Sequence, residues 1–282
     1  MNARLSLTVL MDNTVPGDQD LQGEAGLSFL LETAEKKILF DTGLSGLFLA
    51  NAEKMGIGLQ DLKYLVLSHG HIDHTGGLPA LARHLDCVAP RGNKPGIPLV
   101  AHPRCFWQKD KDGRLNGSCM TEEEARGQFI VTLSDKPVWI TDDLVFLGEV
   151  PRNFPFEQTD PGKRLIRHPD GSWEPDRLLD DSALAFRSRE GLVIITGCSH
   201  AGICNITEYA REACGESRVA GIIGGLHLIS PGMRRLKMTG EYLQKLQVPA
   251  LCASHCTSLA AKLGLAKYCP VQEVGVGTRI VW

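Results

Sequence analysis

The segment "SHGHIDH", residues 68–74, concentrates side chains that can bind metal ions. It places His69, His71, Asp73 and His74 within six residues. Neutral imidazoles suit zinc, iron or manganese, and a carboxylate beside a further imidazole suits a second ion of the same kind. On an extended segment His69 and His71 face one side, while Asp73 and His74 reach a second point from the following turn. The spacing predicts two divalent cations, with zinc preferred over manganese or iron. A solvated histidine-rich turn is the alternative.

Further ligands must come from later in the chain. The apolar run "LVIITGCSH" leads into Cys198 and His200, and "PALCASH" leads into His255. Side chains two residues apart at a strand end point the same way, so we predict that these three contact metal. His227, in "GGLHL", is either a functional residue of the site or a core histidine bonded to a backbone carbonyl. Three other histidines are weaker candidates: His84, His102 and His168.

A layered α/β fold is expected to position these residues. The apolar run at 64–68 is typical of a strand covered on both faces, and helical spacing follows it at 76–85. The stretch 182–197 alternates around a charged glycine turn, which predicts a hairpin. Helices and strands then alternate to the end of the chain. We expect one domain spanning residues 1–282.

The middle of the chain, residues 103–180, is rich in glycine, proline and charge, and predicts a loop-rich insertion. Its later part, 152–179, has the character of a mobile cover. Several basic residues of this region either clasp a substrate phosphate or belong to solvated loops: Arg104, Lys109, Lys111, Arg114 and Arg164.

Composition excludes several classes of partner. The chain has 282 residues, with 30 Lys+Arg against 33 Asp+Glu and a net charge of −3. This balance gives no long-range attraction to nucleic acid or to an anionic membrane. No apolar run approaches the ~18 residues of a membrane span, and the N-terminal stretch lacks a signal-peptide pattern. Nine scattered cysteines fit a reducing compartment, so a cytoplasmic protein is expected.

These motifs resemble those of a known superfamily. "SHGHIDH" is similar to the HxHxDH motif of the metallo-β-lactamase superfamily, and "ILFDTG" resembles its strand that ends in a supporting aspartate, here Asp41. The stretches "GEVPR", "GCSHAGICN", "GGLHL" and "SHCTS" resemble the group named for dihydropterin-ribofuranosylaminobenzene phosphate synthase. Because "GEVPR" belongs to this pattern, the resemblance implies that Arg152 binds substrate. The resemblance implies a four-layer αββα sandwich of the α/β (α+β) class, with a dinuclear site at one edge of the two sheets.

The sequence departs from the superfamily pattern at two points. The "GHTPG" element that supplies a third histidine is missing, and "LLDDSALAF" stands near its place. Asp180, Asp181 or His200 could replace that histidine. Cys198 stands where the bridging acid is expected, and it could bridge the ions, bind one of them or line the pocket. Asp73, Asp181 and His227 are the candidate catalytic residues.

The resemblance implies an enzyme that acts on a phosphorylated or pterin-like small molecule, by transfer with loss of diphosphate. Metal-dependent hydrolysis of an ester or phosphodiester is the alternative, because both reactions need dications to neutralise oxyanion charge. Reduction of oxygen or nitric oxide at di-iron is disfavoured, since superfamily members of that type carry an acid where this chain has His71. A non-catalytic ligand-binding protein is a further hypothesis. The sequence does not specify the oligomeric state.

Overall fold

The first of three β-sheets contains the strand that leads into the histidine-rich segment. The computed structural model describes residues 4–17, 19–88, 96–158 and 160–282. Seven strands run in the order β17-β1-β2-β3-β4-β5-β8, and the pairs from β3 to β8 are parallel. The strands are β1 (Ser6–Met11), β2 (Ser28–Glu32), β3 (Lys37–Phe40), β4 (Tyr64–Val66), β5 (Pro98–Ala101), β8 (Ile130–Leu133) and β17 (Arg279–Val281).

The second sheet contains the strands that lead to the later ligands. Its order is β16-β15-β14-β13-β10-β9, with β14, β15 and β16 parallel to one another. The predicted hairpin is confirmed, because Ser188 pairs with Gly191 at its turn. The strands are β9 (Val138–Trp139), β10 (Leu144–Phe146), β13 (Ala183–Ser188), β14 (Gly191–Thr196), β15 (Val219–Gly225) and β16 (Leu251–Ser254).

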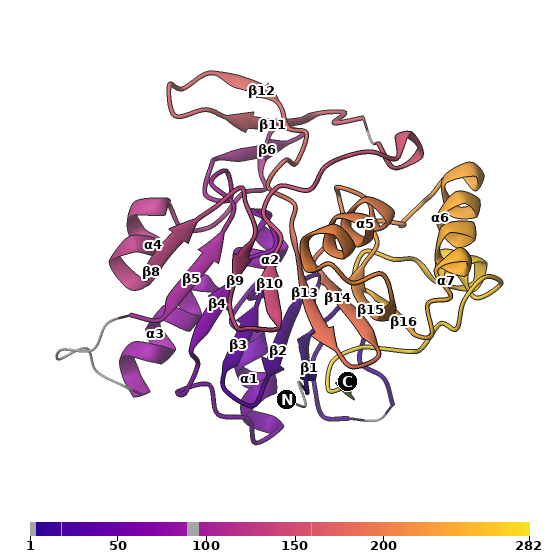
Figure 1. Ribbon diagram of the computed structural model, residues 1–282. Coiled ribbons are helices and arrows are strands. Elements are labelled where there is room, and N and C mark those ends of the chain that lie inside the picture. The colour runs from indigo at the N-terminus through magenta and orange to yellow at the C-terminus, as the bar shows by residue number, and fades with distance from the viewer. Residues whose placement is uncertain (1–3, 18, 89–95, 159) are drawn as a thin grey trace.

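Helices cover the outer face of each sheet, so the molecule has four layers (Figure 1). Along β2, Phe29 and Leu31 pack between the two sheets, whereas Leu30 packs against the helices on the other side. This alternation follows from the two-residue period of a strand, and each buried side chain contributes about 1.5–3 kcal/mol. The predicted αββα sandwich is confirmed. The helices are α1 (Leu47–Lys54), α2 (Ile72–Thr75), α3 (Leu78–Val88), α4 (Glu122–Gln128), α5 (Ile203–Cys214), α6 (Met233–Lys245) and α7 (Leu259–Leu265).

The middle of the chain contains more regular structure than the sequence predicted. A third sheet, in the order β12-β11-β6-β7, forms where we expected loops, and it lies across the top of the molecule in Figure 1. Helices α1 and α4 were also not predicted. The described part of the insertion, which lacks residue 159, includes β6 (Lys109–Lys111), β7 (Arg114–Leu115), the 3-10 turn η1 (Pro155–Glu157), β11 (Arg164–Arg167) and β12 (Trp173–Pro175).

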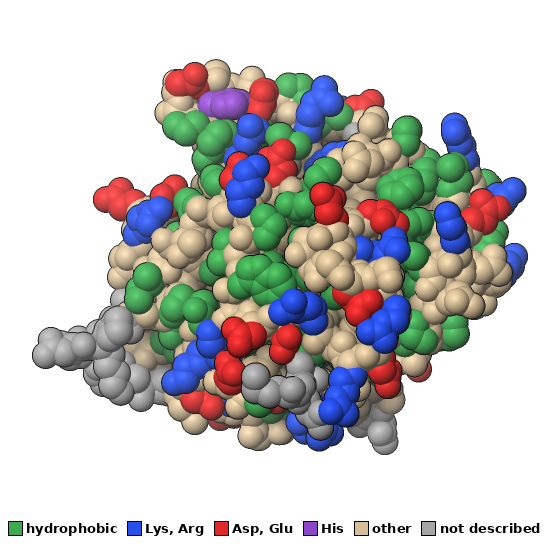
Figure 2. Space-filling model, viewed as in Figure 1, with side chains coloured by type: hydrophobic (Ala, Val, Ile, Leu, Met, Phe, Trp, Pro, Cys, Tyr) green, Lys and Arg blue, Asp and Glu red, His purple; other side chains and the backbone are tan. Residues whose placement is uncertain are grey.

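Figure 2 shows acidic and basic side chains interspersed over one face of the molecule. Among the described residues, no helix combines the length and the apolar character needed to cross a bilayer.

Candidate metal centre

The candidate ligands gather because parallel strands end at the same edge of a sheet. Thr196 ends β14, Gly225 ends β15 and Ser254 ends β16, and the sequence of each continues into a Cys- or His-containing turn. In the first sheet, β4 ends at Val66 and leads into the histidine-rich segment. The edges of the two sheets therefore bring together side chains from four separate stretches of the chain.

Within the histidine-rich segment, the first two imidazoles face one point. The Nε2 atom of His69 lies 3.0 Å from the Nδ1 atom of His71, and both side chains are buried. Asp73 and His74 follow on the single turn of α2, where the Nε2 atom of His74 is 3.9 Å from the Oδ2 atom of Asp73. The segment thus brings all four candidate ligands into the same region.

A buried carboxylate behind the segment orients these rings. The Oδ2 atom of Asp41 lies 2.6 Å from the Nδ1 atom of His74 and accepts a hydrogen bond of 2.6 Å from the Ser68 hydroxyl. The Ser68 hydroxyl is also 2.9 Å from the Nδ1 atom of His69. With Nδ1 engaged in this way, the Nε2 atom of each ring points towards the candidate centre. Carboxylates in this position fix the tautomer and orientation of metal-binding histidines.

The second sheet adds Cys198, His200 and His255. The Sγ atom of Cys198 is 3.2 Å from the Nε2 atom of His74, and the ring of His200 lies 4.9 Å from those of His69 and His71. The Nε2 atom of His255 is 3.4 Å from the Oδ2 atom of Asp73, while its Nδ1 atom contacts Asn13 at 2.7 Å.

Three sets of donor atoms in this centre could each hold a metal ion. Within each set the ligand atoms lie within 4.8 Å of one another. Cys198 belongs to two of the three, so its thiol lies where they overlap. The sets are His69, His71 and Asp73; His69, Cys198 and His200; and Asp73, His74, Cys198 and His255.

Unpaired nitrogen atoms show that the centre fits cations. Among the described residues, both ring nitrogens of His200 and the Nε2 atom of His255 are buried without a hydrogen-bond partner. An unsatisfied buried polar atom costs about 1–3 kcal/mol, so such a cluster calls for a compensating ligand. A cation coordinated by these nitrogens would provide that compensation.

The electrostatics favour the neutral, metal-binding form at three of the histidines, whereas His74 is held in its protonated form. Burial holds the pKa of His69 and of His200 well below the ordinary value, and it lowers that of His71 to about 3. These rings are therefore neutral, as coordination requires. Burial would also lower the pKa of His74, but the carboxylates of Asp41 and Asp73 raise it to about 9.

Backbone strain is concentrated at the same edge. Asp41, Ser199, His227 and His255 have φ between 49° and 60°, a region that non-glycine residues seldom occupy. Such strain costs about 1–3 kcal/mol per residue and persists where the surrounding structure imposes it, often at functional sites.

The turn between the first two histidines is clamped from two sides. A Cβ atom on Gly70 would lie 2.0 Å from the Cys105 carbonyl oxygen, so only glycine fits. On the other side, the Gly70 amide donates a 2.8 Å hydrogen bond to Asp180. Asp180 accepts a second bond, of 2.9 Å, from Lys109, which also donates to Asp176 at 3.1 Å.

Lys109 therefore fits neither of the two roles that the sequence offered for it, which were binding a substrate phosphate or lying in a solvated loop. Its side chain is 1% exposed, so it is neither a solvated residue nor free to clasp a phosphate. Burial would lower its pKa, but the carboxylates of Asp180 and Asp176 raise it. The two carboxylate oxygens of Asp180 accept hydrogen bonds from Gly70 and Lys109. Asp180 belongs to none of the metal-binding donor groups found among the described residues.

Asp181 and Arg152 lie behind the turn that carries His200. The Ala201 amide donates to the Oδ2 atom of Asp181 at 2.8 Å, and burial raises the pKa of Asp181 to about 7. Arg152 donates a 2.6 Å hydrogen bond to the Leu178 carbonyl oxygen, and its positive charge lowers the pKa of Asp181. Of the three alternatives for the missing histidine, the structure brings His200, rather than Asp180 or Asp181, against the other imidazoles.

The weaker histidine candidates lie in other environments. His102 faces Glu149 at 3.4 Å, and His168 pairs with Glu174 at 2.9 Å. His84 is a half-buried residue of α3. Within the described part of the chain, none of the three joins a donor group.

Cys256 is a potential ligand that the sequence did not single out. It forms a further donor group with Cys198 and His227. The residue directly follows His255 in "SHCTS", and that adjacency was the available signal.

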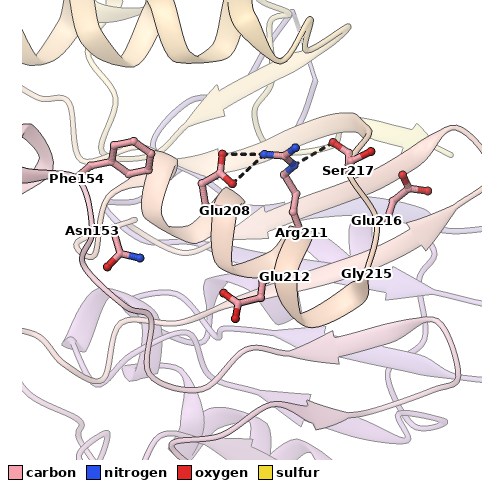
Figure 3. A pocket seen from close by; sticks show the side chains of 8 residues that line it. All are labelled: Asn153, Phe154, Glu208, Arg211, Glu212, Gly215, Glu216 and Ser217. Atoms are coloured by element: carbon pink, nitrogen blue, oxygen red, sulfur yellow. Dashed lines mark hydrogen bonds and ion pairs between the residues drawn. The ribbon is translucent and has the colours of Figure 1, made fainter.

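A separate hollow runs along α5, away from the donor groups. Its volume is about 580 Å³, and Figure 3 shows the residues that line it. Arg211 crosses it and donates two bonds of 2.8 Å to Glu208 and one of 2.9 Å to the Ser217 carbonyl oxygen. Arg211 is therefore paired within the hollow and is not free to bind an anionic ligand.

Known proteins resemble the chain along its length. A family model described as "Metallo-beta-lactamase superfamily" matches residues 21–211. The chain is 33% identical to 7,8-dihydropterin-6-methyl-4-(beta-D-ribofuranosyl)-aminobenzene-5'-phosphate synthase of Methanocaldococcus jannaschii, over 84% of this chain and 82% of that protein. An uncharacterized protein of the same organism is 29% identical over 93% of this chain and 94% of its own length.

A solved structure shares the fold closely. The crystal structure of Tm1679, described as a metal-dependent hydrolase of the beta-lactamase superfamily, superposes with a TM-score of 0.82. The two chains are 27% identical, and the superposition covers 98% of each.

Proposed function

Because the chain belongs to the metallo-β-lactamase superfamily, we propose that it is a dinuclear-metal enzyme acting on a phosphorylated or pterin-like small molecule, with transfer and loss of diphosphate as its reaction. The observation that carries this proposal is the 33% identity to the Methanocaldococcus jannaschii synthase over more than four-fifths of both chains. The buried donor groups support it independently, since they would hold cations beside a substrate phosphate.

We assign the ligands of the two cations by the direction of their side chains. One cation would be held by His69, His71 and His200, and the other by His74, His255 and Asp73. Cys198 would lie between them, because its thiol belongs to groups on both sides. The donor set favours zinc over manganese or iron, since it combines imidazoles with a thiol. When bound, the dications would supply the positive charge that stabilises a developing oxyanion or a departing diphosphate.

The remaining residues position the ligands and the substrate. Asp41 and Ser68 hold the rings of His74 and His69, while Asp180 holds the turn between the first two histidines. We propose that Asp73, besides binding a cation, orients the attacking group, and that Asp181 and His227 complete the catalytic set. His227 lies beside the centre, with its ring 4.2 Å from that of His200.

Arg152 is the proposed substrate-binding residue. Its Nη2 atom is held by the Leu178 carbonyl oxygen, whereas its buried Nε atom has no hydrogen-bond partner among the described residues. A guanidinium with a free donor suits a phosphate oxygen. We further propose that residues 1–282 form a single domain, with the insertion at 103–180 covering the centre.

A metal-dependent hydrolase is the second candidate function. The observation that favours it is the superposition on Tm1679, which is described as a metal-dependent hydrolase. The same dications and ligands would serve the hydrolysis of an ester or phosphodiester. A non-catalytic ligand-binding role is the third candidate.

One experiment separates these functions. The full chain, purified without chelator, is incubated with an activated dihydropterin diphosphate and the ribofuranosylaminobenzene phosphate, and diphosphate release and condensed product are measured. A panel of esters and phosphodiesters is assayed in parallel. Diphosphate and product in equal amounts support transfer, whereas turnover of the panel alone supports hydrolysis. His71→Ala is expected to lower either activity at least 100-fold, and unchanged activity would contradict the assigned centre.

The free cysteines agree with the cytoplasmic location that we propose. All nine are free in the structure. Cell fractionation with an antibody against the protein would test this location directly.

A further inference from the structure

A second cluster of donor atoms shares Cys198 with the candidate centre. The Sγ atoms of Cys198 and Cys256 and a ring nitrogen of His227 lie within 4.8 Å of one another. Strand register brings them together, because Gly225 of β15 pairs with Ser254 of β16. Two residues beyond the end of each strand, the same alignment sets His227 beside Cys256.

The contacts of this cluster hold the Cys256 thiol in place. The His227 amide donates to the Cys256 Sγ atom at 3.2 Å, and the Cys256 thiol donates to the Cys198 carbonyl oxygen at 3.5 Å. A Cβ atom on Gly225 would lie 2.6 Å from the Cys256 Sγ atom, so the glycine makes room for the sulfur. Cys198 is 3% exposed and Cys256 is 8% exposed.

An unpaired buried nitrogen indicates that the cluster is built for a ligand. The Nδ1 atom of His227 is buried without a hydrogen-bond partner among the described residues. The backbone of His227 is also held at a φ of 49°, a conformation that costs energy for a residue with a side chain. An inert core histidine would satisfy its ring nitrogen and would not require this backbone.

We propose that Cys198, Cys256 and His227 form a sulfur-rich third cation position beside the two-cation centre. Two thiolates and one imidazole are a donor set that selects thiophilic divalent cations, zinc foremost, and leaves one coordination position open. As the third cation binds, the Cys256 S–H bond breaks, a metal–sulfur bond forms and the proton passes to solvent. Cys198 would already be a thiolate once the two-cation centre is filled. The inference rests on the proposed function through Cys198, which the two sites share.

Cobalt titration tests the third position with the protein as it exists. The metal-free chain, kept reduced and free of oxygen, is titrated with Co²⁺ while sulfur-to-cobalt charge-transfer absorption is recorded, and bound metal is counted by elemental analysis. We expect three equivalents in the wild type, with the last accompanied by a rise in charge-transfer absorption. Cys256→Ser and His227→Ala are each expected to bind two equivalents and to lack that final rise.

A matched control uses a cysteine of similar burial. Cys269 is 6% exposed and belongs to no donor group among the described residues, so Cys269→Ser should behave as the wild type. Circular dichroism would establish that each variant is folded. Equal stoichiometry and equal charge-transfer absorption in the wild type and in folded Cys256→Ser would overturn the proposal.

The same titration distinguishes failure of the third position from failure of the proposed function. If the histidine centre exists without the sulfur-rich position, the wild type and Cys256→Ser both bind two equivalents, and His71→Ala binds fewer. If only the sulfur-rich position exists, the wild type binds one equivalent with charge-transfer absorption, and His71→Ala leaves it unchanged.

Discussion

Asp41 is the residue that links the backbone of the first sheet to the imidazoles of the centre. It follows β3 directly and lies at a φ of 60°, where it accepts bonds from the Ser68 amide and hydroxyl and contacts His74. This supporting role is the one that the resemblance of "ILFDTG" to the superfamily's strand implied.

Asp41→Asn is expected to weaken metal binding without removing any ligand. An amide cannot provide the charge that orients the His74 ring, and loss of such a partner lowers metal affinity about 10–100-fold. Competition against a chromophoric chelator would measure the change in affinity. Asp61→Asn, at a half-exposed ion pair with Lys37, is the control and should leave the affinity unaltered. An affinity equal to that of the wild type would show that Asp41 does not orient the ligands.

Lys109 is the residue that sequence patterns describe least well. Its neighbours in "KDKDGRLNGS" are charged, so the stretch has the composition of a solvated loop. Only the docking of the third sheet buries its ammonium group between Asp176 and Asp180, and those partners are 67 and 71 residues away. Long-range pairing of this kind leaves no trace in local spacing.

Lys109→Met is expected to destabilise the protein strongly. Removing one partner of a buried ion pair leaves an uncompensated charge and costs about 3–5 kcal/mol. Urea unfolding followed by circular dichroism would measure the free energy of unfolding. Lys111→Met, two residues along the same strand but exposed, should change that free energy by less than about 0.5 kcal/mol. Similar values for the two variants would indicate that the buried pair contributes nothing.

At the scale of elements, helix α5 begins without a capping side chain of its own. Gly202 precedes it, and the backbone amides of Cys204 and Asn205 donate instead to the carboxylate of Glu157, at 3.0 and 2.9 Å. Glu157 belongs to η1, 47 residues earlier, so η1 and the start of the helix that follows His200 are joined by one carboxylate. An acidic group at this end also interacts favourably with the helix dipole.

The Glu157 carboxylate is expected to make stability depend on pH. Burial raises its pKa in spite of the two backbone hydrogen bonds. The folded state therefore holds more protons than the unfolded state between the unfolded pKa, about 4.3, and the raised folded value, so the free energy of unfolding falls as pH rises through this window. The stability of the wild type relative to Glu157→Gln should be greatest below the window and decline across it. Urea titrations at several pH values would measure this difference.

Glu212→Gln provides the control for that experiment. Glu212 is exposed on the same helix, so its replacement should give a difference that stays nearly constant with pH. A constant difference for Glu157→Gln as well would contradict the assignment of the pH dependence to Glu157.

The elements that the sequence predicted are those with strong local patterns. The runs at 64–68 and 182–197 predicted β4 and the β13–β14 hairpin because a buried strand reads as a continuous or alternating apolar segment. Helix α4 begins with a capping box between Thr121 and Glu124, a local sequence pattern that is typical of a helix start. The third sheet was missed for a different reason, since its strands are two to four residues long and are rich in charge.

The residues of the candidate site also divide into those that local sequence patterns predicted and those that they did not. His69, His71, Asp73 and His74 were predictable because their spacing alone places them together. The association of Cys256 with Cys198 and His227 was not, because it depends on the register between β15 and β16. The spacing of residues within one segment can be read directly from the sequence. The register between two strands that are distant in the sequence is set only when the chain packs.

At the scale of the whole molecule, the proposed cations would connect the two halves of the sandwich. The candidate ligands come from the turn after β4 in one sheet and from the turns after β14 and β16 in the other. A ligand that binds only the folded state stabilises it by about 4 kcal/mol when its free concentration is 1,000 times its Kd.

Removal of metal is therefore expected to lower the melting temperature. Dialysis against a chelator should reduce Tm by several degrees, and added zinc should restore it, as followed by scanning calorimetry. His71→Ala should show a smaller loss on chelation, because it lacks one ligand from the start. A Tm that is indifferent to chelator and to zinc would contradict metal binding at this centre.

The buried lysine of the third sheet limits how this fold can be re-engineered. Chimeras between related enzymes often exchange a surface insertion to change which substrates are accepted. Here such an exchange would have to carry Lys109, Asp176 and Asp180 together, because replacing only the segment that contains the lysine would leave both acids unpaired, and Asp180 bonds the turn between His69 and His71. The three residues must therefore be exchanged as one unit, although 67 positions separate Lys109 from Asp176.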